Sequence, residues 1–167
     1  MGTIGFTAGL VAGVLFALCV GVVLARSRMI VVHKSPYPLE ETVGRLEAAI
    51  RGAGWMLADS KRLNDSLERN EVFFGPRVHL LKLCEPHHAS TVLADAREMA
   101  CLMPCTFAVY DGDKGETLVS HINTSLMARI FGGTVWRVMG GPVSRAEHAM
   151  LRGALQKDRP VPEADPV

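Results

Sequence analysis

Two short cysteine-containing segments hold the residues best suited to chemistry in this 167-residue chain. The first reads Cys84-Glu85-Pro86-His87-His88 and sets a thiol directly before a predicted helix start at Pro86. Free amides at a helix N-terminus lower the pKa of a nearby thiol. We therefore expect Cys84 to be a reactive thiol with a pKa below the free value of about 8.5. The charge of Glu85 acts in the opposite direction. Cys84 and His87 also have the spacing of half a metal site. The alternative is a small buried Cys84 and histidines on a solvated helix turn.

The second segment reads Cys101-Leu102-Met103-Pro104-Cys105. Its two thiols and one thioether are soft ligands of the kind that suit Cu(I). Three residues separate the cysteines, so the segment is not a C-x-x-C redox motif. The alternative is that Cys101 packs on the inner face of a helix and Cys105 begins a strand. Together the two segments give the candidate ligands for copper or zinc: Cys84, His87, Cys101, Met103 and Cys105.

Whether the two segments meet depends on strand direction. Strands are predicted at residues 78–84 and 106–110, with a helix from Pro86 to about Met99 between them. If the two strands are adjacent and parallel, Cys84 and Cys105 lie at opposite sheet ends, about 15–20 Å apart by strand rise. An antiparallel arrangement or a dimer brings them together. The sequence leaves this choice open.

The elements that position these residues alternate between strand and helix patterns, which predicts an α+β fold with one mainly antiparallel sheet covered by helices. The predicted strands are at residues 29–33, 55–58, 78–84, 106–110 and 116–122. The predicted helices are at residues 39–50, 86–99, 126–130 and 144–155. Residues 59–75 are expected to form a polar loop with a short helix, and residues 111–115 a hairpin-type loop.

An apolar, uncharged run from Ile4 to Ala25 precedes the domain and is long enough, at 1.5 Å per residue, to cross about 30 Å of hydrocarbon. Small residues recur at every fourth position within it, where another helix can pack closely. These are Gly5, Gly9, Gly13, Ala17 and Gly21. A cleaved signal peptide is the alternative, but no basic residue precedes the run, and the run exceeds the usual 7–15 residues. We therefore expect residues 1–27 to form a retained, single-pass transmembrane anchor.

Charge and cysteine content limit the remaining possibilities. Arg26, Arg28 and Lys34 follow the span, so the positive-inside rule places the domain on the cytoplasmic side of a bacterial inner membrane. The net charge of +1, with scattered basic residues, gives no nucleic-acid surface. Cys19 lies in the span, which leaves an odd number of cysteines in the domain and fits a reducing compartment.

The rest of the chain divides simply. Residues 28–156 are predicted to form one domain, a normal size for a single core, and residues 157–167 a disordered tail. The chain has no P-loop, no G-x-S-x-G motif and no evident pair of carboxylates, and we assign no catalytic residue.

Several segments, in their order along the chain, resemble the Domain of Unknown Function 302 family. They are His33-Lys34-Ser35-Pro36-Tyr37, the helix up to Gly54-Trp55, Leu83-Cys84-Glu85-Pro86, Met103 to Tyr110, and Ile130-Phe131-Gly132-Gly133. The resemblance spans residues 29–139 and implies a small α+β domain that often dimerises, with an N-terminal membrane anchor in bacterial members. Cys84 and Cys105 imply its cysteine-bearing branch. Anchored relatives often carry basic residues before the span, which puts the domain outside. This chain lacks them. The family has no established activity.

Three functions remain. The main prediction is a membrane-anchored accessory or interaction subunit that forms a homodimer or joins a larger membrane complex. The alternative is a thiol or soft-metal protein that handles copper or zinc through Cys84 and Cys105. The third is an enzyme with a small-molecule cleft beside Cys84.

Overall fold

The structure, a computed structural model, describes residues 28–157 together with Gly13 and Gly21. Most of the predicted anchor at residues 4–25, with Gly5, Gly9 and Ala17, lies outside the described residues, as does the predicted tail from residue 158. Among the helices that the structure describes, none combines the length and the apolar character needed to cross a membrane.

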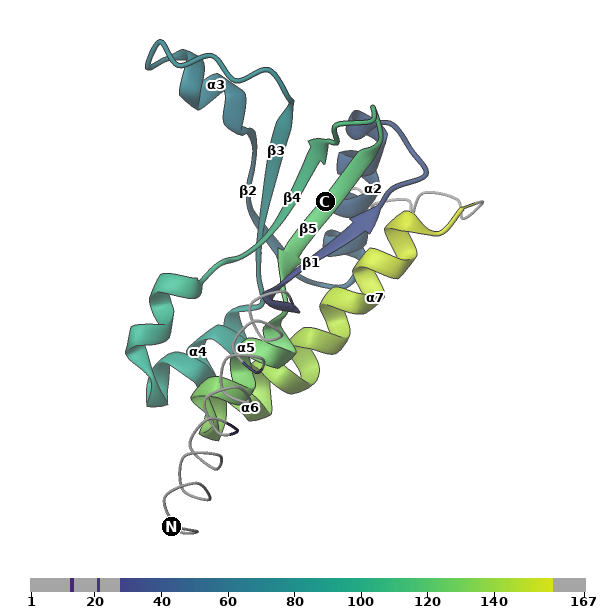
Figure 1. Cartoon of the computed structure of the whole chain (residues 1–167). Coiled ribbons are helices and arrows are strands. Elements are labelled where there is room, and N and C mark those ends of the chain that lie inside the picture. The colour runs from purple at the N-terminus through teal and green to yellow at the C-terminus, as the bar shows by residue number, and fades with distance from the viewer. Residues whose placement is uncertain (1–12, 14–20, 22–27, 158–167) are drawn as a thin grey trace, which may run out of the picture.

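One antiparallel sheet forms the centre of the domain (Figure 1). Its strands are β1 (Ile30–Lys34), β2 (Met56–Arg62), β3 (Val78–Cys84), β4 (Cys105–Asp111) and β5 (Thr117–Ile122). They lie in the order β1-β5-β4-β3-β2, and every neighbouring pair is antiparallel. The predicted α+β class with one antiparallel sheet is therefore confirmed.

Helices lie on one face of this sheet and beyond its ends (Figure 1), and they follow one another closely in the C-terminal third of the domain. They are α2 (Leu39–Gly52), α3 (Leu63–Glu68), α4 (Pro86–Asp95), a 3-10 helix (Arg97–Leu102), α5 (Thr124–Phe131), α6 (Gly133–Val138), a π-turn (Met139–Val143) and α7 (Ser144–Leu155).

The core lies between one face of the sheet and the helices α2 and α7, which contact each other. Leu81, Phe107 and Val119 point to this face from three adjacent strands and are fully buried. On α2, apolar residues at helical spacing, including Leu46 and Ile50, meet them. On β1, exposed and partly buried residues alternate. Ile30 and Val32 point to the opposite face of the sheet and are largely exposed.

The two largest differences from the predicted element boundaries are at the end of a helix and the end of a strand, and one further helix was not predicted. The helix expected to reach Met99 ends at Asp95, because Ala96 leaves the helical region with φ −142° and ψ 78°. The strand expected at residues 55–58 begins at Met56 and continues to Arg62. Gly132 ends α5 with φ 67°, as predicted. Its carbonyl then accepts the amide of Trp136 at 2.9 Å and opens α6, a helix too short to show a periodic signal.

Candidate functional site

Strand direction brings the two cysteine segments to the same end of the sheet. β3 and β4 are adjacent and antiparallel, with Leu83 opposite Cys105. The connection from Glu85 to Pro104, which carries α4 and the 3-10 helix, therefore returns to the end of the sheet that it left. The parallel arrangement that would separate Cys84 from Cys105 does not occur.

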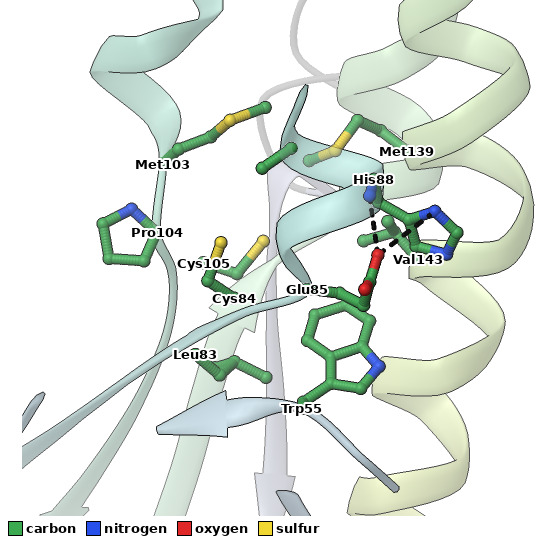
Figure 2. Close-up of a pocket in the computed structure, with 11 residues that line it drawn as sticks. Trp55, Leu83, Cys84, Glu85, His88, Met103, Pro104, Cys105, Met139 and Val143 are labelled. Atoms are coloured by element: carbon green, nitrogen blue, oxygen red, sulfur yellow. Dashed lines mark hydrogen bonds and ion pairs between the residues drawn. The ribbon is translucent and has the colours of Figure 1, made fainter. Parts of the chain in front are cut away.

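Both thiols line one small pocket beside the ends of these strands (Figure 2). The sulfur atoms of Cys84 and Cys105 point to the same side of the pocket, where Met103 and Met139 complete the wall. The other lining residues are Trp55, Leu83, Glu85, His88, Ala89, Pro104 and Val143. The cavity measures about 20 Å³, which is room for one water-sized particle. The pocket therefore suits a single ion better than an organic substrate.

The thiol of Cys84 is not activated in the way the sequence predicted. Its pKa is raised, first by burial and second by the charge of Glu85. The Glu85 carboxylate caps α4 and accepts the amides of His87 at 3.2 Å and His88 at 2.6 Å. The donors that were expected to stabilise a Cys84 thiolate are thus occupied by a carboxylate. The expectation of a lowered Cys84 pKa is wrong for this physical reason.

Cys105 lies deeper and next to a buried carboxyl group. Glu147, from α7, is only 2% exposed, and its Oε2 accepts the hydroxyl of Thr124 at 2.7 Å. The Cys105 thiol also hydrogen-bonds this carboxyl group. Burial and the nearby Glu147 raise the pKa of Cys105 well above its ordinary range. Burial likewise raises the pKa of Glu147. At neutral pH and without a bound cation, both pocket cysteines are therefore protonated thiols.

The structure brings together only part of the predicted ligand set. Cys84, Met103 and Cys105 line the pocket. His87 is exposed on the first turn of α4 and does not line the pocket. Cys101 is also exposed, and it lines a neighbouring cavity of about 150 Å³ that shares Pro104, Cys105 and Met139 with the first.

The residues that line the pocket limit which metal ions it could bind. Between residues 28 and 157, no three His, Cys, Asp or Glu side chains are grouped so as to hold a metal ion. The cysteines of this part, Cys84, Cys101 and Cys105, are free thiols. What the pocket does offer is two thiols and two thioethers, which are soft donors, beside the Glu85 carboxylate that caps α4 and the ring of His88.

Sequence reasoning missed Met139, Trp55 and Glu147, and it chose His87 where the structure puts the neighbouring His88 in the pocket wall. Met139 and Trp55 are far from the cysteines in sequence, so no local pattern marks them. Glu147 did leave a signal: it falls at helical spacing with Ser144, Leu151 and Ala154, all of which are buried. A carboxylate on an otherwise core-facing helix stripe is unusual enough to single out.

A second group of titratable side chains lies under α7. The Nε2 atoms of His33 and His121, from the edge pair β1 and β5, are 3.4 Å apart. The His148 ring meets the His121 ring edge-on, and its Nδ1 donates to the Ser144 carbonyl at 2.7 Å. His121 is 4% exposed, and its Nδ1 has no hydrogen-bond partner in the described part of the chain. Burial and then His33 lower the pKa of His121 to about 4.

Comparison with known proteins supports the fold. A family model described as "Domain of unknown function DUF302" matches residues 31–156. A crystal structure of an uncharacterized conserved DUF302 protein from Bacillus stearothermophilus is similar, with a TM-score of 0.67 and 17% sequence identity. The similarity covers 75% of this chain and 98% of the Bacillus protein. No curated protein matches the chain.

Proposed function

The chain belongs to the DUF302 family, and from that premise we propose that its domain binds one Cu(I) ion between Cys84 and Cys105 while an N-terminal helix holds it at the membrane. The family description names no activity, so the proposal depends on the site. The observation that carries it is the antiparallel register of β3 and β4, with Leu83 opposite Cys105, which brings both thiols into one ion-sized pocket.

The donor set favours Cu(I) over zinc. Structural zinc sites take four Cys, His or carboxylate ligands in a tetrahedron, and the described residues hold no such group. Two thiolates, with Met103 or Met139 in reach of the same cavity, are the soft and low-coordinate set that Cu(I) prefers.

The electrostatics disfavour thiol nucleophilicity and make metal binding a competition with protons. Raised pKa values keep both thiols protonated at neutral pH, which disfavours attack by a free thiolate. A bound cation reverses this balance, because a coordinating thiol gives up its proton and the ion replaces the missing charge partner. Proton release on metal uptake is the expected consequence.

Anaerobic titration of the full-length protein with Cu(I) tests the proposal. In competition with a chelator of known affinity, we expect one ion bound per chain and an ultraviolet absorption band from thiolate-to-copper charge transfer. Zn(II) under the same conditions should bind far more weakly. Substoichiometric copper, or zinc bound as tightly as copper, would show that the proposal is wrong.

For the anchor, we infer a single-pass helix at residues 4–25 in a bacterial inner membrane, with the domain on the cytoplasmic side. The support is the uncharged apolar run and the basic residues Arg26 and Arg28 that follow it. Close packing at Gly9, Gly13 and their neighbours in the small-residue series would serve contact with another helix.

A second candidate function, an accessory subunit that forms homodimers, is favoured by the uncovered face of the sheet. Ile30, Val32 and Ile122 are exposed together there, on the edge strand β1 and its neighbour β5. Exposed apolar side chains grouped in this way are typical of interaction surfaces.

Sedimentation of the detergent-solubilised protein tests the homodimer. We expect a dimer for the natural sequence and a monomer for Val32→Lys, because the substitution puts a charge in the centre of the apolar face. Phe73→Lys is the matched control, since Phe73 is exposed in the loop after α3. A dimer that survives Val32→Lys would exclude this face as the interface.

A further inference from the structure

The chain enters the domain at one defined point. The Arg28 carbonyl accepts the Asn123 side-chain amide at 3.2 Å, and the Met29 carbonyl accepts the Asn123 backbone amide at 2.8 Å. Asn123 also caps α5, since its side chain accepts the amide of Leu126 at 3.0 Å. Arg28, which follows the apolar run in sequence, therefore lies beside the N-terminus of α5.

Exposed apolar side chains gather where α5 passes into α6. Ile130 is 66% exposed, Phe131 52% and Trp136 38%, although all three are large and hydrophobic. In Figure 1, α5 and α6 lie beyond the end of the sheet at which β1 begins. We call this group, with Arg129 and Arg137, the α5–α6 corner.

The corner is ordered and basic. The Arg129 guanidinium lies over the Trp136 ring, 5.2 Å from its centroid. The ring also packs directly on Gly140, where any Cβ would overlap it. Arg137 donates to Thr134 at 2.6 Å, and the same hydroxyl donates to Asp95, so the nearby carboxylate is already engaged. Two arginines thus flank an apolar surface that includes a fixed tryptophan.

We propose that the α5–α6 corner rests on the surface of the lipid bilayer, with Trp136, Ile130 and Phe131 at the headgroup boundary and the two arginines on anionic phosphates. Tryptophan and arginine together are the side chains that settle at this boundary. The occupant follows from where the chain enters the domain: Arg28, which follows the apolar run in sequence, hydrogen-bonds Asn123 at the N-terminus of α5, the helix that carries Ile130 and Phe131. The inference rests on the proposed anchor.

A tip at the opposite end of the sheet provides the matched control. Phe73, 85% exposed, lies in the loop between α3 and β3, which Figure 1 shows at the far end of the domain from α6. It is at least as exposed as Trp136 and equally apolar. If exposure alone decided contact with lipid, both positions would contact lipid equally. If the α5–α6 corner docks on the bilayer, only Trp136 contacts lipid.

The test uses the full chain in liposomes that contain lipids brominated near the headgroup. With Trp55→Phe, Trp136 is the sole tryptophan. We expect its fluorescence to fall at least twofold relative to unbrominated liposomes and to resist aqueous iodide. The control carries Trp55→Phe, Trp136→Phe and Phe73→Trp, and should respond to iodide and not to bromine.

Flotation separates the two proposals. Protein that floats with the liposomes while Trp136 is quenched by iodide and not by bromine would overturn the docked corner and leave the anchor intact. A Trp136 protected from both quenchers would assign the corner to a protein partner and overturn lipid docking as well. Protein that fails to float would overturn the anchor and, with it, this inference.

Discussion

Replacing Cys84 or Cys105 with serine is expected to lower the affinity for Cu(I) by on the order of 100-fold or more, beyond the loss seen for outer-shell partners. The hydroxyl of serine is a hard ligand and does not replace a thiolate at Cu(I). Met103→Leu should have a smaller effect, because it keeps the shape of the wall and removes only a thioether. The measurement is chelator competition under anaerobic conditions, with stoichiometry from the charge-transfer band.

Cys101→Ser is the matched control, because Cys101 is exposed and does not line the pocket of Cys84 and Cys105. It should bind one ion with unchanged affinity. Since a hydroxyl at the half-buried Cys105 position costs about 1–3 kcal/mol of stability, circular dichroism must confirm that each variant is folded, and Cys105→Ala provides a second route to the same loss. Unchanged affinity in folded Cys84 and Cys105 variants, or a loss in Cys101→Ser, would contradict the assigned site.

Acidification is expected to destabilise the domain through His121. The imidazole has a pKa of about 4 in the folded domain against 6.5 in the unfolded chain. Above pH 6.5 the imidazole is neutral in both the folded and the unfolded state, so it does not change the free energy of unfolding. Between pH 6.5 and 4 only the unfolded chain takes up the proton, so stability falls with pH, by about 3 kcal/mol in total at pH 4.

His121→Phe should remove most of this pH dependence. The ring can still pack against Phe107, which meets His121 edge-on, and it carries no titratable group. Thermal unfolding at pH 7 and pH 5 measures the difference, and pH 5 limits the contribution of carboxylates. A part of the pH dependence remains in this variant because of His33, whose pKa is also lowered by burial and by His148. If His121→Phe loses as much stability between pH 7 and 5 as the natural sequence, His121 is not the source.

Local sequence patterns determined most of the secondary structure. The β-branched run that became β1, the apolar spacing of Leu46 and Ile50 in α2, and Pro86 at the start of α4 each depend on neighbours within one or two turns. Gly132 ended α5 because a positive φ strongly favours glycine. The family resemblance, carried by ordered motifs, agreed with the match over residues 31–156.

Tertiary structure alone decided the chemistry of the site. The same two strands, with the same sequences, would hold Cys84 and Cys105 at opposite ends of the sheet if they ran parallel. Strand direction depends on how the whole α4 connection packs, which no local pattern records. The Cys84 pKa likewise turned on whether the first amides of α4 faced a thiol or the Glu85 carboxylate.

The partners that complete the pocket came from distant elements for the same reason. Met139 and Glu147 reach Cys105 only because α5, α6 and α7 fold back across the end of the sheet. The spacing of residues along a helix shows which of them share a face. On that ground Glu147 can be assigned to the core-facing side of α7 from the sequence. Which residues lie against that side of the helix depends on the packing of the whole domain. The pKa values of the site depend on these neighbours in space and not on neighbours in sequence.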